Sequence, residues 1–296
     1  MVIDETFPWF VQKETKYYIC SSKFNKKWIK ENKDKHLLIC FPGAYFYTSF
    51  IERIKKTLLA KYAKKYFNTC MYHIDQSLTF TKKSHKSWSF IFNRSFAKNF
   101  SFVVTYCYED SLKYKIPLID PVFEDKFAGG GERKWDSVLI TSVATDGARK
   151  QSLIDIFSNP KWNQINHFFY ANDVNGFLNK ERIICEQKPT SCKDYFPCTN
   201  CVVYLRNDLK YLTGTITFCI KNQIKILTDC EYSYNLINDK ENTRLVKDWK
   251  NISEDDILWC KEKIKRDYNE SAKDLIDNDI FAKKLIEIGK TFSGKK

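Results

Sequence analysis

The chain has 296 residues, of which 43% are hydrophobic and 16% aromatic, so it can bury at least one large core, which excludes wholesale disorder. Lysine and arginine number 49 against 36 acidic residues, and the resulting net charge of +13 belongs to a basic chain in which both signs are abundant. No stretch is apolar over the ~18 residues that a transmembrane helix needs, and the amino terminus lacks the apolar segment of a signal peptide. We therefore expect a cytoplasmic protein.

Glycine is scarce, with 9 residues in the chain, and three of these are consecutive at positions 129–131. Neither of the glycine-rich phosphate loops, GxGxxG and GxxxxGK[ST], occurs. The sequence thus argues against kinases, P-loop NTPases and the usual dinucleotide-dependent dehydrogenases. It also lacks the GxSxG, HExxH and EF-hand motifs.

The first half of the chain predicts an alternation of strands and helices. The apolar run 36–41 ends at Pro42-Gly43 and predicts a first buried strand. Residues 49–68 then predict a long amphipathic helix, because five apolar residues are spaced four apart with lysines opposite: Phe50, Ile54, Leu58, Tyr62 and Tyr66. Further strands are predicted over 69–74, 88–92 and 100–108. This order is typical of an α/β domain.

A change in composition around residues 120–135 predicts a domain boundary. Asp120-Pro121 is followed by a charged segment and then by the three consecutive glycines. We expect an N-terminal α/β domain over 1–128 and a C-terminal α/β domain over 134–296. The alternative is an ordinary long loop within one domain, although long loops without structure are uncommon inside compact domains.

The α/β pattern restarts after this boundary. Strands are predicted over 137–143, 165–170, 201–205 and 224–227, and a helix over 148–157. Residues 209–220 fit either a helix or a strand. The C-terminal region predicts charged helices, with Ser253 as an N-cap and a last turn near Gly289.

The 11 cysteines form no obvious disulfide framework, and in a cytoplasmic protein we expect most to be reduced and buried. Four of them lie close together in a polar stretch, and the last two have CxxC spacing: Cys185, Cys192, Cys198 and Cys201. They are either loop thiols or the ligands of a structural zinc ion. We predict no catalytic metal.

The turn at residues 144–150 has the composition of an anion site. A strand end is followed by Thr145, Gly147, and then by two cations, Arg149 and Lys150, in the first turn of the predicted helix. Cations at this position oppose the helix dipole, so a bound phosphate or diphosphate would explain them. The alternative is that both are solvated surface charges.

The strand, the TxGxR-like turn and the helix in TSVATDGARKQSLIDIF, with the later short strand and charged C-terminal helix, resemble the nucleotide-sugar half of GT-B glycosyltransferases. The chain is most similar to glycosyltransferase family 90, the capsule-associated and lipopolysaccharide-A-protein type. Ser142-Val143 stands where that family usually has Arg-Gly, and no glycine-serine-arginine segment occurs around Gly214.

The resemblance implies two Rossmann-like domains facing a cleft, with sugar transfer from a nucleotide sugar, most simply a UDP-sugar, to a glycan or lipid-linked glycan acceptor. It implies that Thr145, Gly147 and Arg149 bind the donor diphosphate and that Thr228 and Glu231 lie near the donor sugar or ribose. It also implies that no metal is required, since basic side chains and helix N-termini hold the leaving diphosphate.

An inverting transfer needs a general base near the acceptor hydroxyl. Asp110, next to Glu109 at the end of the strand predicted over 100–108, and Asp120 in the loop before the glycines are the candidates, and we favour Asp120. Asp120 could instead be a turn residue before Pro121. His73 and His85 are alternative bases, although a lone histidine is more often structural.

The competing hypothesis is a nucleic-acid-binding or nucleic-acid-processing protein, because lysines alternate with aromatic residues over 26–35, 55–67 and 82–94. The same basic residues would also suit peripheral association with an anionic membrane surface that carries the acceptor. A third hypothesis is that they are merely solvated helix faces.

Overall fold

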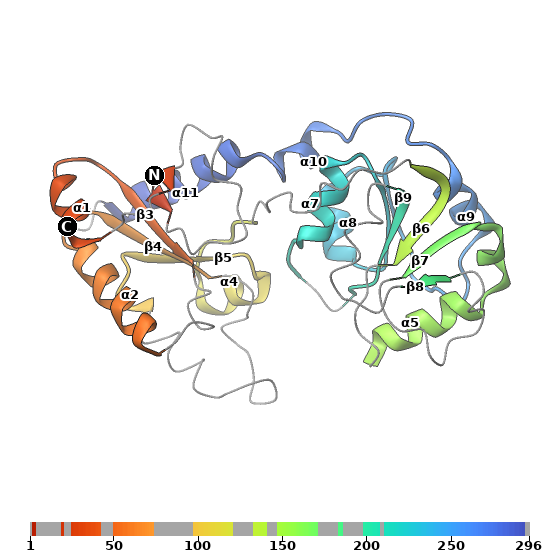
Figure 1. The fold of residues 1–296 in the computed structure, drawn as a ribbon, viewed down its shortest axis with the longest axis horizontal. Helices are drawn as coiled ribbons and strands as arrows, with labels where there is room; N and C mark the ends of the chain where they lie inside the picture. The colour runs from red at the N-terminus through yellow and green to blue at the C-terminus, as the bar shows by residue number, and fades with distance from the viewer. Residues whose placement is uncertain are drawn as a thin grey trace. The chain divides into compact units, whose positions relative to one another are not determined.

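The computed structural model describes residues 2–3, 19–20, 25–42, 50–73, 97–120, 133–140, 147–170, 183–185, 198–207 and 210–293. It divides into two compact units (Figure 1). Unit 1 consists of Met1–Glu124 together with Asp277–Lys296, and unit 2 consists of Asp125–Ile276. The first boundary falls in the segment where the sequence predicts one. The second boundary has no counterpart in the sequence analysis, which assigned the last helix to the C-terminal domain.

Unit 1 is built on a parallel sheet with the strand order β2-β1-β3-β4-β5. Its strands are β1 (Val2–Ile3), β2 (Ile19–Cys20), β3 (Leu38–Pro42), β4 (Asn68–His73) and β5 (Phe102–Thr105). Its helices are α1 (Lys26–Glu31), α2 (Phe50–Ala63), α4 (Tyr108–Tyr114) and α11 (Asn278–Ser293). Leu118 extends the sheet beyond β5 through a bridge to Thr105.

Unit 2 is built on a second parallel sheet with the strand order β11-β10-β9-β6-β7-β8. Its strands are β6 (Lys134–Ile140), β7 (His167–Tyr170), β8 (Ile183–Cys185), β9 (Thr199–Tyr204), β10 (Lys225–Thr228) and β11 (Thr243–Leu245). Its helices are α5 (Gly147–Ser158), η2 (Pro160–Gln164), α7 (Gly214–Lys221), α8 (Glu231–Ile237), α9 (Glu254–Lys261) and α10 (Glu270–Asp274). Counted from β6, this is the 3-2-1-4-5-6 order of a Rossmann sheet.

Helix α11 returns to unit 1 and covers one face of its sheet, where Figure 1 shows it beside β3 and β4. Phe281 meets the ring of Tyr72 edge to face at 5.6 Å, and Phe292 stacks on Phe102 at 5.0 Å. The backbone carbonyl of Gly289 accepts a hydrogen bond of 3.2 Å from Asn68 Nδ2. The predicted C-terminal helix is therefore confirmed, and it ends at Ser293, four residues beyond the last turn expected near Gly289.

Helix α2 packs on the opposite face of the sheet, but with a different side from the one predicted. Ala60 and Ala63 are fully buried, whereas Ile54 and Leu58 are 45% and 56% exposed. Residues spaced strictly by four advance about 40° around a helix at each step, so the predicted row winds away from the sheet. The small alanines face the core because they let the helix backbone lie close to Ile39 and Met71.

The sheet of unit 2 is buried on both faces, since alternate residues of β6 and β9 enter different clusters. One cluster joins Val138 and Val203 to α5 and α9, and the other joins Leu139 and Val202 to α7 and α8. Such two-sided burial is typical of a parallel α/β sheet. The ambiguous segment 209–220 contains helix α7, so the helical alternative is confirmed there.

Most of the predicted strands are confirmed with shifted ends, and three predictions need comment. β1 and β2 precede the strand predicted to be the first. β5 ends at Thr105 and is followed by α4 from Tyr108, so the strand predicted over 100–108 is too long. The strand predicted over 88–92 lies outside the described residues. Among the described helices, none is both long and apolar enough to cross a bilayer.

Candidate functional site

The carboxyl edge of the unit 2 sheet has a topological switch point between β6 and β9. From β6 the chain proceeds through α5 to β7 on one side, whereas β9, on the other side of β6, leads through α7 to β10. Helices α5 and α7, which follow these two central strands, thus pack on opposite faces of the sheet. In open α/β sheets this divergence leaves a crevice in which ligands bind.

Two helices begin beside this switch point without an acidic residue in their first turn. Helix α5 starts at Gly147, and α7 starts at Gly214 after Thr213, whose side chain makes no capping hydrogen bond. Free N–H groups and the helix dipole make such N-termini suitable for anions. Sequence analysis identified the α5 turn but missed α7, because the helix or strand character of its segment was undecided.

The sequence-predicted donor residues fall partly within the described structure. Arg149, which is half-buried, and Lys150, which is exposed, occupy the first turn of α5, while Gly147 begins the helix. Thr145 lies outside the described residues. The structure therefore places two cations of the predicted anion site at the switch point.

Thr228 is the last residue of β10 and Glu231 lies three residues beyond it, and the two side chains differ in exposure. Thr228 is fully buried, and its hydroxyl donates to the carbonyl of Tyr204 at 2.8 Å while accepting from the Cys230 amide at 2.9 Å. These hydrogen bonds direct the Thr228 hydroxyl into the fold rather than toward a ligand. Glu231 is the exposed first residue of α8, so its carboxylate is available at the carboxyl edge.

An aspartate that the sequence analysis did not select joins the segments after β9, β10 and β11. Asp229 Oδ1 accepts the Arg206 amide at 2.8 Å, and Oδ2 accepts Trp249 Nε1 at 3.0 Å. Because Trp249 is buried in the core, the carboxylate fixes the carboxyl edge to the body of unit 2. The only sequence signal is an Asp directly after a short buried strand, which is also common in turns.

The candidate bases lie at the carboxyl edge of the unit 1 sheet. Asp110 is fully buried in the first turn of α4, next to Cys107, whose thiol pKa is raised by burial, whereas Glu109 is exposed. Asp120 is half-buried and directly follows Ile119, which donates to Thr105 O at 2.9 Å. Burial hides Asp110 from an acceptor, whereas Asp120 is half-buried with one buried carboxylate oxygen, so Asp120 stays the candidate base. The side chain of His73 and the whole of His85 lie outside what the structure describes.

The cysteine cluster does not have the form of a zinc knuckle where it is described. Cys201 is fully buried inside β9 and contacts Cys260 of α9, whereas Cys198 is half-buried before the strand begins. A strand carries Cys201 into the core, so the CxxC pair cannot form one compact loop. The described residues contain no group of metal-binding side chains, and the side chains of Cys185 and Cys192 lie outside them.

No protein-family model matches the chain, and no curated protein matches it. Solved structures do. Anabaena HepE in complex with UDP and glucose has a TM-score of 0.56 at 8% identity, with 93% of this chain and 85% of that chain covered. The pneumococcal O-GlcNAc transferase GtfA in complex with UDP and GlcNAc has a TM-score of 0.50 at 9% identity, with 90% and 59% covered.

A third structure, of accessory secretory proteins 1, 2 and 3 of Streptococcus pneumoniae, has a TM-score of 0.53 at 12% identity, with 91% of this chain and 57% of that chain covered. Identities this low concern the fold alone. The chain forms two Rossmann-like parallel α/β units, and these structures match it over nine-tenths of its length. The chain therefore has the fold of GT-B glycosyltransferases.

Proposed function

We propose that the protein is a glycosyltransferase that moves a sugar from a nucleotide sugar to a glycan or lipid-linked glycan. The observation that carries this proposal is the switch point of unit 2, flanked by two helix N-termini without acidic residues. A diphosphate is the ligand that such an edge suits best. The similar HepE and GtfA structures contain UDP, which makes a UDP-sugar the first donor to test.

In this proposal Arg149 and Lys150 hold the donor diphosphate together with the amides at the start of α5 and α7. Glu231 is the candidate partner for the ribose or the donor sugar, and Thr145 remains a candidate for the diphosphate. Thr228 does not contact the donor in this proposal. Its hydroxyl links the end of β9 to the segment after β10 through hydrogen bonds to Tyr204 and Cys230. We propose that basic groups and helix N-termini replace a metal ion as the charge stabiliser. The closer similarity to glycosyltransferase family 90 stays a prediction.

Arg149→Ala is expected to weaken UDP binding about 10- to 150-fold while leaving the fold intact, because a hydrogen bond to a charged group is worth ~1.5–3 kcal/mol. Isothermal titration of UDP into both proteins, with and without EDTA, measures the effect. Lys273→Ala is the matched control, since it removes one positive charge from the same unit at a residue that, like Arg149, is half-buried.

Equal UDP affinity of the two variants would remove Arg149 from the donor site, and loss of binding in EDTA would contradict the metal-free proposal. A short single-stranded oligonucleotide, titrated at two salt concentrations, tests the competing hypothesis. Salt-sensitive binding of the oligonucleotide without any binding of UDP would favour a nucleic-acid-binding protein.

We also propose that unit 1 associates with an anionic membrane surface that carries the acceptor. Three exposed apolar residues follow one another along α2: Ile51, Ile54 and Leu58, exposed at 66%, 45% and 56%. The neighbouring Lys55 and Lys61 are also exposed. An apolar stripe with lysines beside it suits the interface of an anionic bilayer, where each cation adds about 1 kcal/mol of binding.

Ile51→Ser combined with Leu58→Ser is expected to reduce binding to phosphatidylglycerol vesicles at least tenfold, since about 1.5–3 kcal/mol per buried apolar side chain is lost. Vesicle co-sedimentation measures the binding. Leu112→Ser, which removes a leucine exposed at 63% on α4, is the matched control. Unchanged sedimentation of the double variant would contradict the membrane proposal and leave the donor site unaffected.

A further inference from the structure

Unit 1 contains a hollow, away from the edge that carries Asp120. It has a volume of about 400 Å³ and lies where helix α11 crosses the amino ends of β3 and β4. Leu38 and Asn68, the first residues of these strands, form part of its wall. β3 spans five residues at ~3.3 Å each, so the hollow is separated from the carboxyl edge by the length of a strand.

The polar lining of this hollow is basic. Lys35 and His36 come from the segment before β3, and Lys290 comes from α11, while no carboxylate among the described residues lines the hollow. The acidic neighbours in sequence, Asp34 and Glu287, are exposed and do not line it. Within the described part of the chain, no hydrogen bond or ion pair engages the side chains of Lys35, His36 or Lys290.

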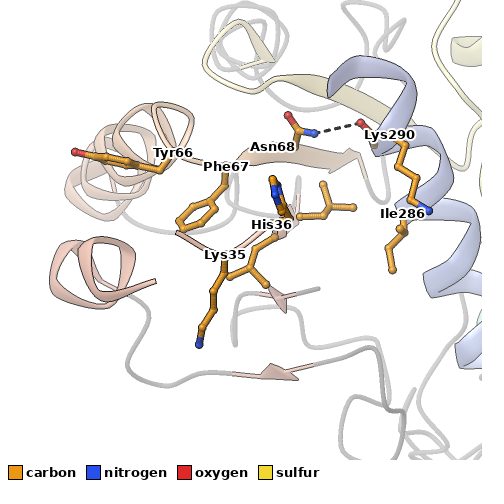
Figure 2. A pocket seen from close by; sticks show the side chains of 10 residues that line it. Lys35, His36, Tyr66, Phe67, Asn68, Ile286 and Lys290 are labelled. Atoms are coloured by element: carbon orange, nitrogen blue, oxygen red, sulfur yellow. Dashed lines mark hydrogen bonds between the residues drawn. The ribbon is translucent and has the colours of Figure 1, made fainter. Parts of the chain in front are cut away.

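The remaining wall is largely apolar, with Asn68 as its polar residue besides Tyr66. Figure 2 shows His36 between the ring of Phe67 and helix α11, with Ile286 and Lys290 on the helix side. Phe67 is 2% exposed and belongs to the core, and the hydrogen bond from Asn68 to Gly289 fixes α11 against the strand. The hollow thus combines the buried ring of Phe67 with three exposed basic side chains.

We propose that this hollow binds the phosphate of a small organic phosphate, such as a sugar phosphate. Lys35 and His36 supply N–H donors from one segment and Lys290 supplies them from α11, and a phosphate has several acceptor oxygens for such donors. The largely apolar wall leaves room for the organic part, because ~300–1,000 Å³ is the usual volume of small-molecule sites. This site is independent of the donor site proposed in unit 2, so its ligand does not compete with UDP.

The proposal is tested by titrating glucose 6-phosphate into the full chain, with glucose as the uncharged control, in the presence of saturating UDP. Lys35→Gln combined with Lys290→Gln is expected to weaken binding of glucose 6-phosphate at least tenfold. Lys33→Gln combined with Lys283→Gln is the matched control, because both lysines are exposed, lie on the same two segments and do not line the hollow. The two double variants have the same net charge.

Equal affinities of the two double variants, or equal binding of glucose and glucose 6-phosphate, would overturn the proposal. Phosphate of the same chemistry also occurs in lipid headgroups, so phosphatidylglycerol and phosphatidylcholine vesicles form a second arm. Vesicle binding that needs Lys35 and Lys290, without binding of the soluble ester, would keep the phosphate site and assign its ligand to the membrane. Loss of UDP binding in Arg149→Ala, with this site intact, would separate the two sites.

Discussion

Asp120→Asn is expected to slow sugar transfer by about 10²- to 10⁴-fold while leaving the affinity for the nucleotide sugar unchanged, because a positioned general base contributes that much to the rate. The backbone holds this residue at the carboxyl edge of the unit 1 sheet. Ile119, just before it, donates to Thr105 O at 2.9 Å and accepts from the Tyr72 hydroxyl at 2.7 Å. An amide has the same shape as the carboxylate but cannot accept the acceptor's proton.

The rate of UDP release from the bound nucleotide sugar measures this effect, with water or a glycan as acceptor. Glu109→Gln is the matched control, since it neutralises an exposed carboxylate near the same edge. Asp110→Asn is expected to lower stability more than the rate, because Asp110 is fully buried. An Asp120→Asn enzyme that keeps its rate within fivefold would exclude Asp120 as the base.

The parallel α/β architecture could be predicted because its signals are local. The apolar runs that became β3, β6 and β10 are short, rich in Ile, Leu and Val, and bounded by turn residues. The order of the strands is not local. Nothing in the sequence of β6 states that β9 lies beside it, so the switch point could be described only from the structure.

The path of the C-terminal helix shows a second limit of sequence reasoning. The apolar residues of α11 predict an amphipathic helix, but periodicity does not identify the sheet that its apolar face covers. Ile276 packs on the core of unit 2, while Phe281 packs on unit 1, so the chain changes unit at Asp277. The Asp277 carboxylate caps α11, because its Oδ1 accepts hydrogen bonds from the amides of Asp279 and Ile280. This aspartate thus has a structural role at the start of the helix.

Sequence analysis identified candidate site residues whose charge is unusual for their place in a helix. It missed a residue whose hydrogen-bond partner is distant in the sequence. Arg149 and Lys150 stood out because cations oppose the dipole at a helix start. Thr228 was implied by the resemblance to GT-B glycosyltransferases, although its hydroxyl is engaged within the fold. Asp229 was missed because its partner Trp249 lies 20 residues away, and no spacing rule joins them.

Lys225→Met is expected to destabilise the protein by about 1–3 kcal/mol, because a buried acceptor that loses its donor costs that much. Lys225 is 2% exposed on β10, and its ammonium group donates to the carbonyls of Trp259 and Glu262 at the end of α9. The ammonium group also lies 4.7 Å from the centre of the Trp259 ring. Asn200 also donates to carbonyls at the end of α9, since its Nδ2 lies 2.6 Å from Cys260 O and 2.9 Å from Glu262 O.

Urea unfolding of the wild type and the variant measures the effect, and Lys247→Met, an exposed lysine, should change stability by less than ~0.5 kcal/mol. Burial lowers the pKa of Lys225, so the unfolded chain binds its proton more tightly than the folded one. The contribution of Lys225 to stability therefore increases as the pH rises from the folded pKa toward ~10.4, the unfolded value. The gap between the wild type and Lys225→Met should widen over this range, and a gap that narrows would show that the fold raises the pKa of Lys225 instead of lowering it.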